Sequence, residues 1–216
     1  AGDALTVGSQ NIAIGYSALT SDTKGSKSIA IGESALYTQN FTSATDTYNV
    51  AVGENAGMLV TTGIRNTLIG GLAGDALTDA DKNTAVGQGA LSTDTLGNLS
   101  VAIGYDALSV QNFTSATDSY NTAVGPFAGA SVTTGVENTI VGALAADAMT
   151  TGDSNTFIGK SSAGTGVVTG DNNTGVGKAS GLNLTSGSNN LFLGHDAGVT
   201  GSPGGNITTA SNEISL

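Results

Sequence analysis

The strongest constraint on the fold is a short phrase that recurs along the whole chain. Its clearest copy is residues 83–87, Asn-Thr-Ala-Val-Gly, with an alanine three residues after the glycine. Successive copies are usually 17 residues apart, with one spacing of 18 and two of 21. Self-similarity at such a period is typical of repeat architectures, in which each unit stacks on its neighbours. The aligned glycines are Gly15, Gly32, Gly53, Gly70, Gly87, Gly104, Gly125, Gly142, Gly159, Gly177 and Gly194.

The residues before each aligned glycine alternate as they do in a β-strand. The residue directly before the glycine is always Ile, Val or Leu, and the residue two places earlier is Ile, Val, Leu or Thr. A period of two with many β-branched side chains indicates one short strand per repeat. We expect this aliphatic face, represented by Val86, to point into the interior.

Apolar residues at helical spacing are absent, so we predict an all-β fold. The expected architecture is a parallel β-solenoid or β-roll of about eleven coils of 17–21 residues. Residues 1–216 form a single repeat domain, with residues 1–10 as a partial first coil and residues 199–216 as an atypical last coil. Because residues 1–6 repeat residues 73–78, we expect the chain to be a piece cut from a longer fibre.

A second apolar site follows each glycine and should fill one corner of the coil. It is either a leucine four residues after the glycine or an aliphatic residue about three positions later. The coil after Gly194 has Gly201-Ser202-Pro203 instead, which predicts fraying or a change of structure there. The expected corner residues are Leu19, Leu36, Val60, Leu77, Leu91, Leu108, Val132, Met149, Val167 and Leu184.

Two further positions define the turns. Four places before the glycine stands Asn in nine copies, and Ser28 or Ser100 in the other two. These amides either bond along the stack as a ladder or only enter the turn before the strand, and neither interpretation makes Asn a binding residue. Glycines of turn dipeptides such as Thr62-Gly63 are expected to supply a positive φ.

A single coil of this composition buries little apolar surface. The alanine three places after each aligned glycine, as at Ala18 and Ala90, leaves room for another backbone. We therefore expect three identical chains to wind around a common axis as an intertwined homotrimer that shares an aliphatic interior.

The pattern Asn/Ser-x-Ala-Ile/Val-Gly-x-x-Ala resembles the head repeats of trimeric autotransporter (YadA-like) adhesins, whose family fold is a left-handed parallel β-roll trimer. The longer coils, with Thr-Thr-Gly and Ser-Asn-Asn turns, are more similar to the repeat shafts of tailed-phage tail fibres. This resemblance implies a non-enzymatic structural or host-recognition segment of a trimeric tail fibre in the virion. The alternative that it implies is the head of a bacterial adhesin, displayed on the cell surface and binding host surfaces.

Charge and composition exclude several other classes. The net charge is −11, from 17 acidic and six basic residues, which disfavours binding to nucleic acid or to an anionic membrane surface. The chain has no cysteine, so it has neither disulfides nor thiolate metal sites. No apolar run reaches the ~20 residues of a membrane-spanning helix, so no membrane insertion is expected.

No constellation of residues supports catalysis, a cofactor or a metal. The single histidine, His195, has no sequence-visible partner system, and its slot holds Tyr, Glu or Lys in other coils. Asp79 with Asp81, and Asp171 with its two following asparagines, are the best oxygen clusters, but each occurs once and is better interpreted as a solvated turn. We expect no catalytic residue, no cofactor and no metal site.

The two 21-residue coils are the best candidates for recognition. They share the sequence Gln-Asn-Phe-Thr-Ser-Ala-Thr-Asp at residues 39–46 and 111–118, and their four extra residues should bulge outward as loops. Exposed aromatics there would be able to stack on a host-cell surface glycan or dock on a host protein. The alternative is that they fold down and cover the coil edge. The candidate contact residues are Phe41, Tyr48, Phe113 and Tyr120.

Overall fold

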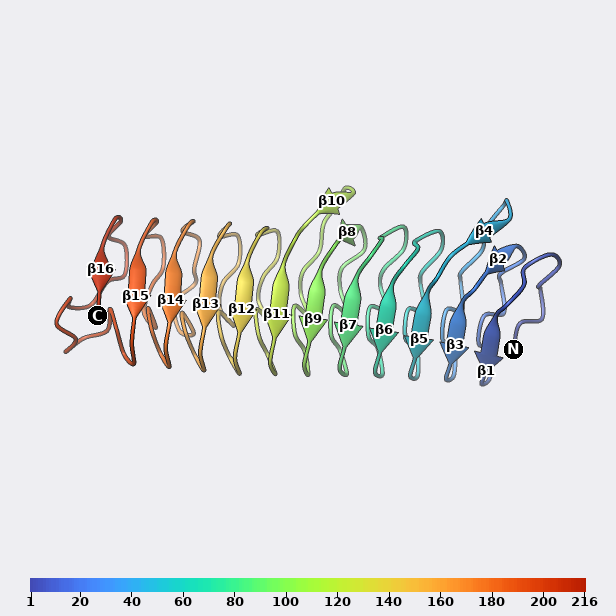
Figure 1. Cartoon of the computed structure of the whole chain (residues 1–216), viewed down its shortest axis with the longest axis horizontal. Helices are drawn as coiled ribbons and strands as arrows, with labels where there is room; N and C mark the ends of the chain where they lie inside the picture. The colour runs from blue at the N-terminus through green and yellow to red at the C-terminus, as the bar shows by residue number, and fades with distance from the viewer.

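The computed structural model describes all 216 residues as a rod of stacked coils without any helix (Figure 1). Each coil contributes one three-residue strand, and the two inserted coils add short two-residue strands. The strands are β1 (Ile12–Ile14), β2 (Gly25–Ser26), β3 (Ile29–Ile31), β4 (Thr45–Asp46), β5 (Val50–Val52), β6 (Thr67–Ile69), β7 (Thr84–Val86), β8 (Gly97–Asn98), β9 (Val101–Ile103), β10 (Thr117–Asp118), β11 (Thr122–Val124), β12 (Thr139–Val141), β13 (Thr156–Ile158), β14 (Thr174–Val176), β15 (Leu191–Leu193) and β16 (Ile214–Ser215).

One parallel sheet of twelve strands runs the length of the rod, in the order β1-β3-β5-β6-β7-β9-β11-β12-β13-β14-β15-β16. Every strand pairs with the equivalent residues of the next coil, as in Thr84 with Val101 and Val86 with Ile103. The termini therefore lie at opposite ends of the rod (Figure 1). The prediction of an all-β parallel solenoid of about eleven coils is confirmed.

The expected orientation of the strands is wrong. In β7, Ala85 at the centre of the strand is fully buried, whereas Thr84 and Val86 on either side are only partly buried. The same pattern holds in the other coils, and Ile14 and Leu193 are 59% and 49% exposed. The aliphatic face thus points outward from its own chain, and the narrow interior takes the central side chain of each strand, which is alanine in six of the eleven coils.

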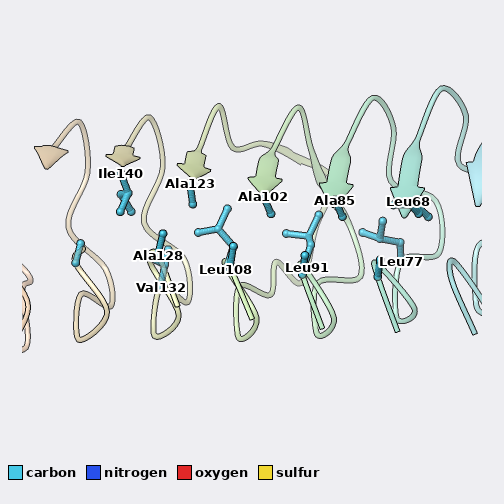
Figure 2. Packing of buried hydrophobic residues seen from close by; sticks show 14 of the residues in the cluster. Leu68, Leu77, Ala85, Leu91, Ala102, Leu108, Ala123, Ala128, Val132 and Ile140 are labelled. Carbon is cyan, nitrogen blue, oxygen red and sulfur yellow. The ribbon is translucent and has the colours of Figure 1, made fainter. Parts of the chain in front are cut away.

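The interior is filled by balancing two positions in each coil. Where the strand centre is alanine, as at Ala85 and Ala102, a leucine from the opposite corner reaches across to it (Figure 2). Where the strand centre is larger, as at Leu68, the corner position is glycine: a Cβ at Gly74 would collide with the Leu68 side chain. Both positions belong to one continuous buried cluster, so neighbouring coils share a single thin core.

The alanines three places after the aligned glycines also lie inside this core. Ala18 and Ala90 are fully buried within their own chain. The expectation that these small residues leave room for another backbone is therefore wrong. They leave room for the corner side chain of their own coil instead.

The corner residues lie as expected in most coils, with two corrections. In the coil with the one-residue insertion, Val168 is fully buried and Val167 is 56% exposed, so the extra residue shifts the corner by one position. The last coil neither frays nor lacks a corner residue: Ile207 is 5% exposed, and Ile214 of β16 pairs with Leu191 of β15. Residues 201–206 lengthen the coil without breaking its register.

The glycines are required for close packing between coils. The aligned Gly87 has φ of 136°, and a Cβ there would meet the carbonyl of Gly104 in the next coil. The turn glycine Gly63 does not have a positive φ, so that expectation is wrong. A Cβ on Gly63 would instead collide with the carbonyl oxygen of Ala80, and the corresponding turn glycines are crowded in the same way.

The asparagines form a buried ladder and also fix the turns. The side-chain oxygen of Asn66 accepts the backbone N–H of Asn83 at 2.9 Å, and the Asn83 Nδ2 donates to the carbonyl of Gly97 at 2.8 Å. Both asparagines are fully buried. The ladder interpretation is confirmed, because the Asn83 amide bonds to Gly97 and Ser100 of the next coil rather than within its own turn.

Candidate functional site

The two insertions are extruded beside the stack, as expected. β2 pairs with β4 in parallel, and β8 pairs with β10, so each insertion adds a two-stranded sheet at one corner of the rod. In Figure 1, β4 and β10 rise above the line of the other corners while the main sheet continues without interruption beneath them. The insertions are the largest departures from the repeat.

A buried polar relay anchors each insertion. In the second one, Gln111 donates from its Nε2 to Asp94 Oδ2 at 2.6 Å and to the Ser100 hydroxyl at 2.9 Å. Its Oε1 accepts a hydrogen bond from Asn121 Nδ2 at 2.8 Å. The other Asp94 oxygen accepts the backbone N–H of Gly97 at 3.0 Å. The relay ties the insertion to the asparagine ladder.

The first insertion repeats this relay almost atom for atom. Gln39 Nε2 donates to Asp22 Oδ2 at 2.6 Å and to the Ser28 hydroxyl at 2.9 Å, and Asn49 Nδ2 donates to Gln39 Oε1 at 2.8 Å. All four residues are buried. Burial raises the pKa of the equivalent Asp94 carboxyl, although the hydrogen bonds from Gln111 and from backbone amides oppose this shift.

These relay residues were not predicted as a set from the sequence. The signal that could have found them is the 72-residue spacing, which relates Asp22 to Asp94 as strictly as it relates Gln39 to Gln111.

The four aromatic candidates divide into two kinds. Phe41 and Phe113 are only 6% and 5% exposed, so they fold down over the coil, as the alternative interpretation holds. Tyr48 and Tyr120 are 49% and 55% exposed and remain available for contact. The structure therefore brings each Phe into the edge of the core and leaves one tyrosine per insertion on the surface.

The surroundings of the two tyrosines differ. Lys27 donates to the Tyr48 hydroxyl at 3.0 Å, forms an ion pair with Asp46, and lies 5.0 Å from the centroid of the Tyr48 ring. The hydrogen bonds to Asp46 and then to Tyr48 raise the pKa of Lys27. In the second insertion, Tyr120 bonds only to Asp118, at 3.4 Å.

The largest feature of the surface is the outward aliphatic face of the long sheet. It carries two rows of side chains, one from the first and one from the third residue of each strand, and the third position is Ile, Val or Leu in every coil. Eleven strands at a spacing of ~4.8 Å make this face roughly 50 Å long. A contiguous apolar strip of this kind is typical of a surface that another protein covers.

The outward aliphatic face consists of Ile12, Ile14, Ile29, Ile31, Val50, Val52, Thr67, Ile69, Thr84, Val86, Val101, Ile103, Thr122, Val124, Thr139, Val141, Thr156, Ile158, Thr174, Val176, Leu191 and Leu193.

The residues considered for chemistry are dispersed. His195 is exposed and contacts only the adjacent Asp196, with Nδ1 3.2 Å from Oδ2. Asp81 accepts the backbone N–H of Ile64 at 2.8 Å, and Asp171 accepts that of Asp153 at 2.9 Å, so both carboxylates join a second ladder along the turns. No three or more acidic or histidine side chains gather in a group that fits a metal ion, and the surface has no pocket.

Two half-buried aspartates are desolvated without full hydrogen bonding. Asp75 and Asp147 lie 72 residues apart, and the Oδ1 atom of each is buried without a hydrogen-bond partner. Desolvation raises the pKa of both carboxyls. They are structural equivalents on the two halves of the rod rather than members of one site.

The structure contains no helix with the length and apolarity to cross a bilayer. No known protein family, curated protein or solved structure matches the chain.

Proposed function

We propose that this chain is a non-enzymatic structural and host-recognition segment of a trimeric phage tail fibre, located in the virion. The outward aliphatic face carries this proposal. A rod that leaves a strip of Ile, Val and Leu exposed along its whole length needs a partner of equal length, and a second and third copy supply one.

Three copies placed with their aliphatic faces toward a common axis would form the interior that a single chain lacks. Each coil has only a thin core, with alanine at most strand centres. Shared burial of the Ile, Val and Leu side chains of the outward aliphatic face would then add apolar stabilisation to this core. This is the intertwined homotrimer expected from the sequence, with the aliphatic rows between chains rather than inside each one.

Recognition would fall to the insertions. Tyr48 and Tyr120 are exposed two residues after the protruding strands β4 and β10, and three copies would repeat them around the axis. The partner that this arrangement fits is a host-cell surface glycan or protein, because an exposed aromatic ring can stack on a sugar or dock on a protein surface.

The alternative is the head domain of a bacterial trimeric adhesin on the cell surface. The same outward face and the same insertions would serve that role, since both classes need a stiff trimeric rod with contact residues on its outside. The flanking sequence distinguishes the two: a C-terminal folding chaperone favours the fibre, and a coiled-coil stalk with a membrane anchor favours the adhesin.

Assembly is tested by light scattering on the purified chain across a dilution series. We expect a particle of three chains, and Val86→Asp with Ile103→Asp should shift it toward monomers, because buried charges on the aliphatic face carry a large desolvation cost. Thr84→Ser on the same face is the matched control. A wild-type chain that stays a folded monomer contradicts the proposal.

Recognition is tested separately by the binding of labelled chain to bacterial cells and to animal cells. Tyr48→Ala with Tyr120→Ala should reduce binding to bacteria while the particle mass is unchanged. Binding to animal cells only, or to extracellular matrix, favours the adhesin.

A further inference from the structure

Each strand of the outward face is flanked by two exposed or partly exposed residues that form rows of their own. The leading edge is the residue five places before the aligned glycine, and the trailing edge is the residue directly after it. In the second coil the order across the face is Lys27, Ile29, Ile31 and Glu33, and the asparagine ladder and strand-centre residues between them point inward. The aliphatic face is therefore bordered along its length by two polar edges.

The full leading edge is Gln10, Lys27, Tyr48, Arg65, Lys82, Leu99, Tyr120, Glu137, Ser154, Asn172 and Asn189. The full trailing edge is Tyr16, Glu33, Glu54, Gly71, Gln88, Tyr105, Pro126, Ala143, Lys160, Lys178 and His195.

The two edges invert their charge together along the rod. In the N-terminal half, the leading edge is basic at Lys27, Arg65 and Lys82, and the trailing edge is acidic at Glu33 and Glu54. In the C-terminal half, the leading edge has Glu137 and the trailing edge has Lys160 and Lys178. Between the halves, both edges are uncharged, with Leu99 and Tyr120 on one and Tyr105 and Pro126 on the other. No charged residue on either edge breaks this pattern.

Most of these charges have no opposite charge within the chain. The ion pairs of the molecule involve the N-terminus with Asp3, Lys27 with Asp46, and His195 with Asp196. Arg65 and Lys82 are exposed and unpaired, as are Glu33 and Glu54 on the other edge. Besides Lys27, the two edges carry four of the six basic residues of the chain, although its net charge is −11. These four are Arg65, Lys82, Lys160 and Lys178.

We infer that the charged side chains of the leading edge of one copy pair with those of the trailing edge of the next, in the same direction and at the same level, while the rings of Tyr48 and Tyr120 stay on the outer side of this seam. This inference rests on the proposed function, because chains of one fibre run in one direction around its axis. Cyclic symmetry then places equivalent coils at equal height and brings each leading edge against a trailing edge. At the same level Lys27 faces Glu33, and Leu99 faces Tyr105 at the uncharged centre. Arg65 lies one coil from Glu54 of the neighbour and Glu137 one coil from Lys160, a spacing of ~4.8 Å that long side chains can bridge.

The pairing limits how far the copies can slip past one another, and the cyclic symmetry sets equal height. A sheet face with side chains of similar size and shape in every coil discriminates little against a slip by one coil. A slip of several coils, however, would bring Lys160 and Lys178 beside the uncharged or basic part of the neighbouring edge. The charges therefore act against misaligned assemblies more than they add affinity.

Cross-linking provides the test, because the chain has no native cysteine. Lys82→Cys with Gln88→Cys places one thiol on each edge of the fifth coil. The two sites are at opposite ends of one strand, up to about 20 Å apart along the chain, so a short bis-maleimide links them only between copies. Lys82→Cys with Lys178→Cys is the control: it uses the same two edges but levels five coils, or about 24 Å, apart.

We expect the Lys82/Gln88 pair to give covalent products up to three chains and the control pair to give none. Light scattering before the reaction separates the two proposals. A monomer contradicts the proposed function, whereas trimers without a Lys82/Gln88 product, or with an equally reactive control, overturn the edge pairing alone. A two-chain product from Glu33→Cys with Lys178→Cys would report antiparallel packing and also overturn it.

A charge exchange gives an independent measurement without cysteines. Arg65→Glu or Glu54→Arg alone should raise the concentration at which the assembly dissociates by about fivefold or more, as expected for loss of exposed ion pairs at each interface. The double variant should restore the wild-type value. The two residues lie on opposite edges of one chain, so they can interact only between copies. If the two effects simply add in the double variant, the residues do not interact and the inference is overturned.

Discussion

The two inserted coils have the same buried hydrogen-bond relay but differ in their surface residues. The relay of Asp22, Gln39 and Asn49 has the same donors and acceptors as its counterpart 72 residues later, with distances that agree within 0.1 Å. Outside, the first insertion carries Lys24 and Lys27, and the second carries leucine at both positions.

The comparison shows that the buried residues fix the path of an insertion, whereas its surface residues can differ. Lys24 donates to the carbonyl of Thr42 at 2.9 Å and Lys27 bonds to Asp46, yet the second insertion keeps the same path with neither lysine. The buried relay and the folded-down Phe are therefore sufficient to fix the loop, and the exposed positions are free to vary with what they contact.

The largest expected effect comes from removing the acid of either relay. Asp94→Ala leaves the N–H groups of Gly97 and Phe113 and the Gln111 amide without their acceptor, and we expect a loss of about 4 kcal/mol in the free energy of unfolding. Asp22→Ala should cost the same. Urea unfolding measures both, with the exposed Asp3→Ala as control. A difference above about 1 kcal/mol between the two relays would show that their interiors are not equivalent.

The next effect separates the two kinds of aromatic residue. Phe41→Ala and Phe113→Ala should each cost about 3 kcal/mol, because both rings are buried at the edge of the core. Tyr48→Ala and Tyr120→Ala should leave the urea midpoint nearly unchanged. If the phenylalanines instead serve contact with a partner, their replacement would spare stability and reduce only cell binding.

A smaller effect should appear as a dependence on pH at Asp75 and Asp147. Burial raises their pKa in the folded chain above the unfolded value of 3.8, so the folded state holds its protons more tightly. Their contribution to stability therefore improves as the pH falls through the raised folded pKa toward 3.8 and levels off below it.

Asn substitution removes this dependence. Asp75→Asn with Asp147→Asn should stabilise the chain at pH 7 by on the order of 0.5 kcal/mol per site, once solvent screening is allowed for, and by less at pH 4. Urea unfolding at the two pH values measures the difference. A gain that is equal at both pH values would assign the effect to packing rather than to charge.

The smallest effect is expected from exchanging the outer residues of the insertions. Lys27→Leu copies the second insertion onto the first, and Leu99→Lys does the reverse. Neither should change the urea midpoint of the dissociated chain measurably, since the Lys27 ion pair is exposed. A clear loss of stability in Lys27→Leu would mean that the first insertion depends on its surface, unlike the second.

Much of the fold could be predicted because the repeat ties each residue to its equivalent in the next coil. Once the aligned glycines are found, the pairing of Thr84 with Val101 and the extrusion of the four extra residues follow from continuing the stack. Candidate contact residues were harder to predict: Phe41 and Tyr48 are both aromatic and seven residues apart, but only the tyrosine is exposed.

The sequence by itself determined the period, the parallel register and the positions of the insertions, because hydrogen bonding between identical coils admits one alignment. Only the tertiary structure decided which face of each strand is inside. Alternation at a period of two fits either orientation, and apolarity alone places Val86 inward. The structure shows the opposite orientation. The narrow coil has room for Ala85 and one leucine from the far corner, so the aliphatic row lies outside.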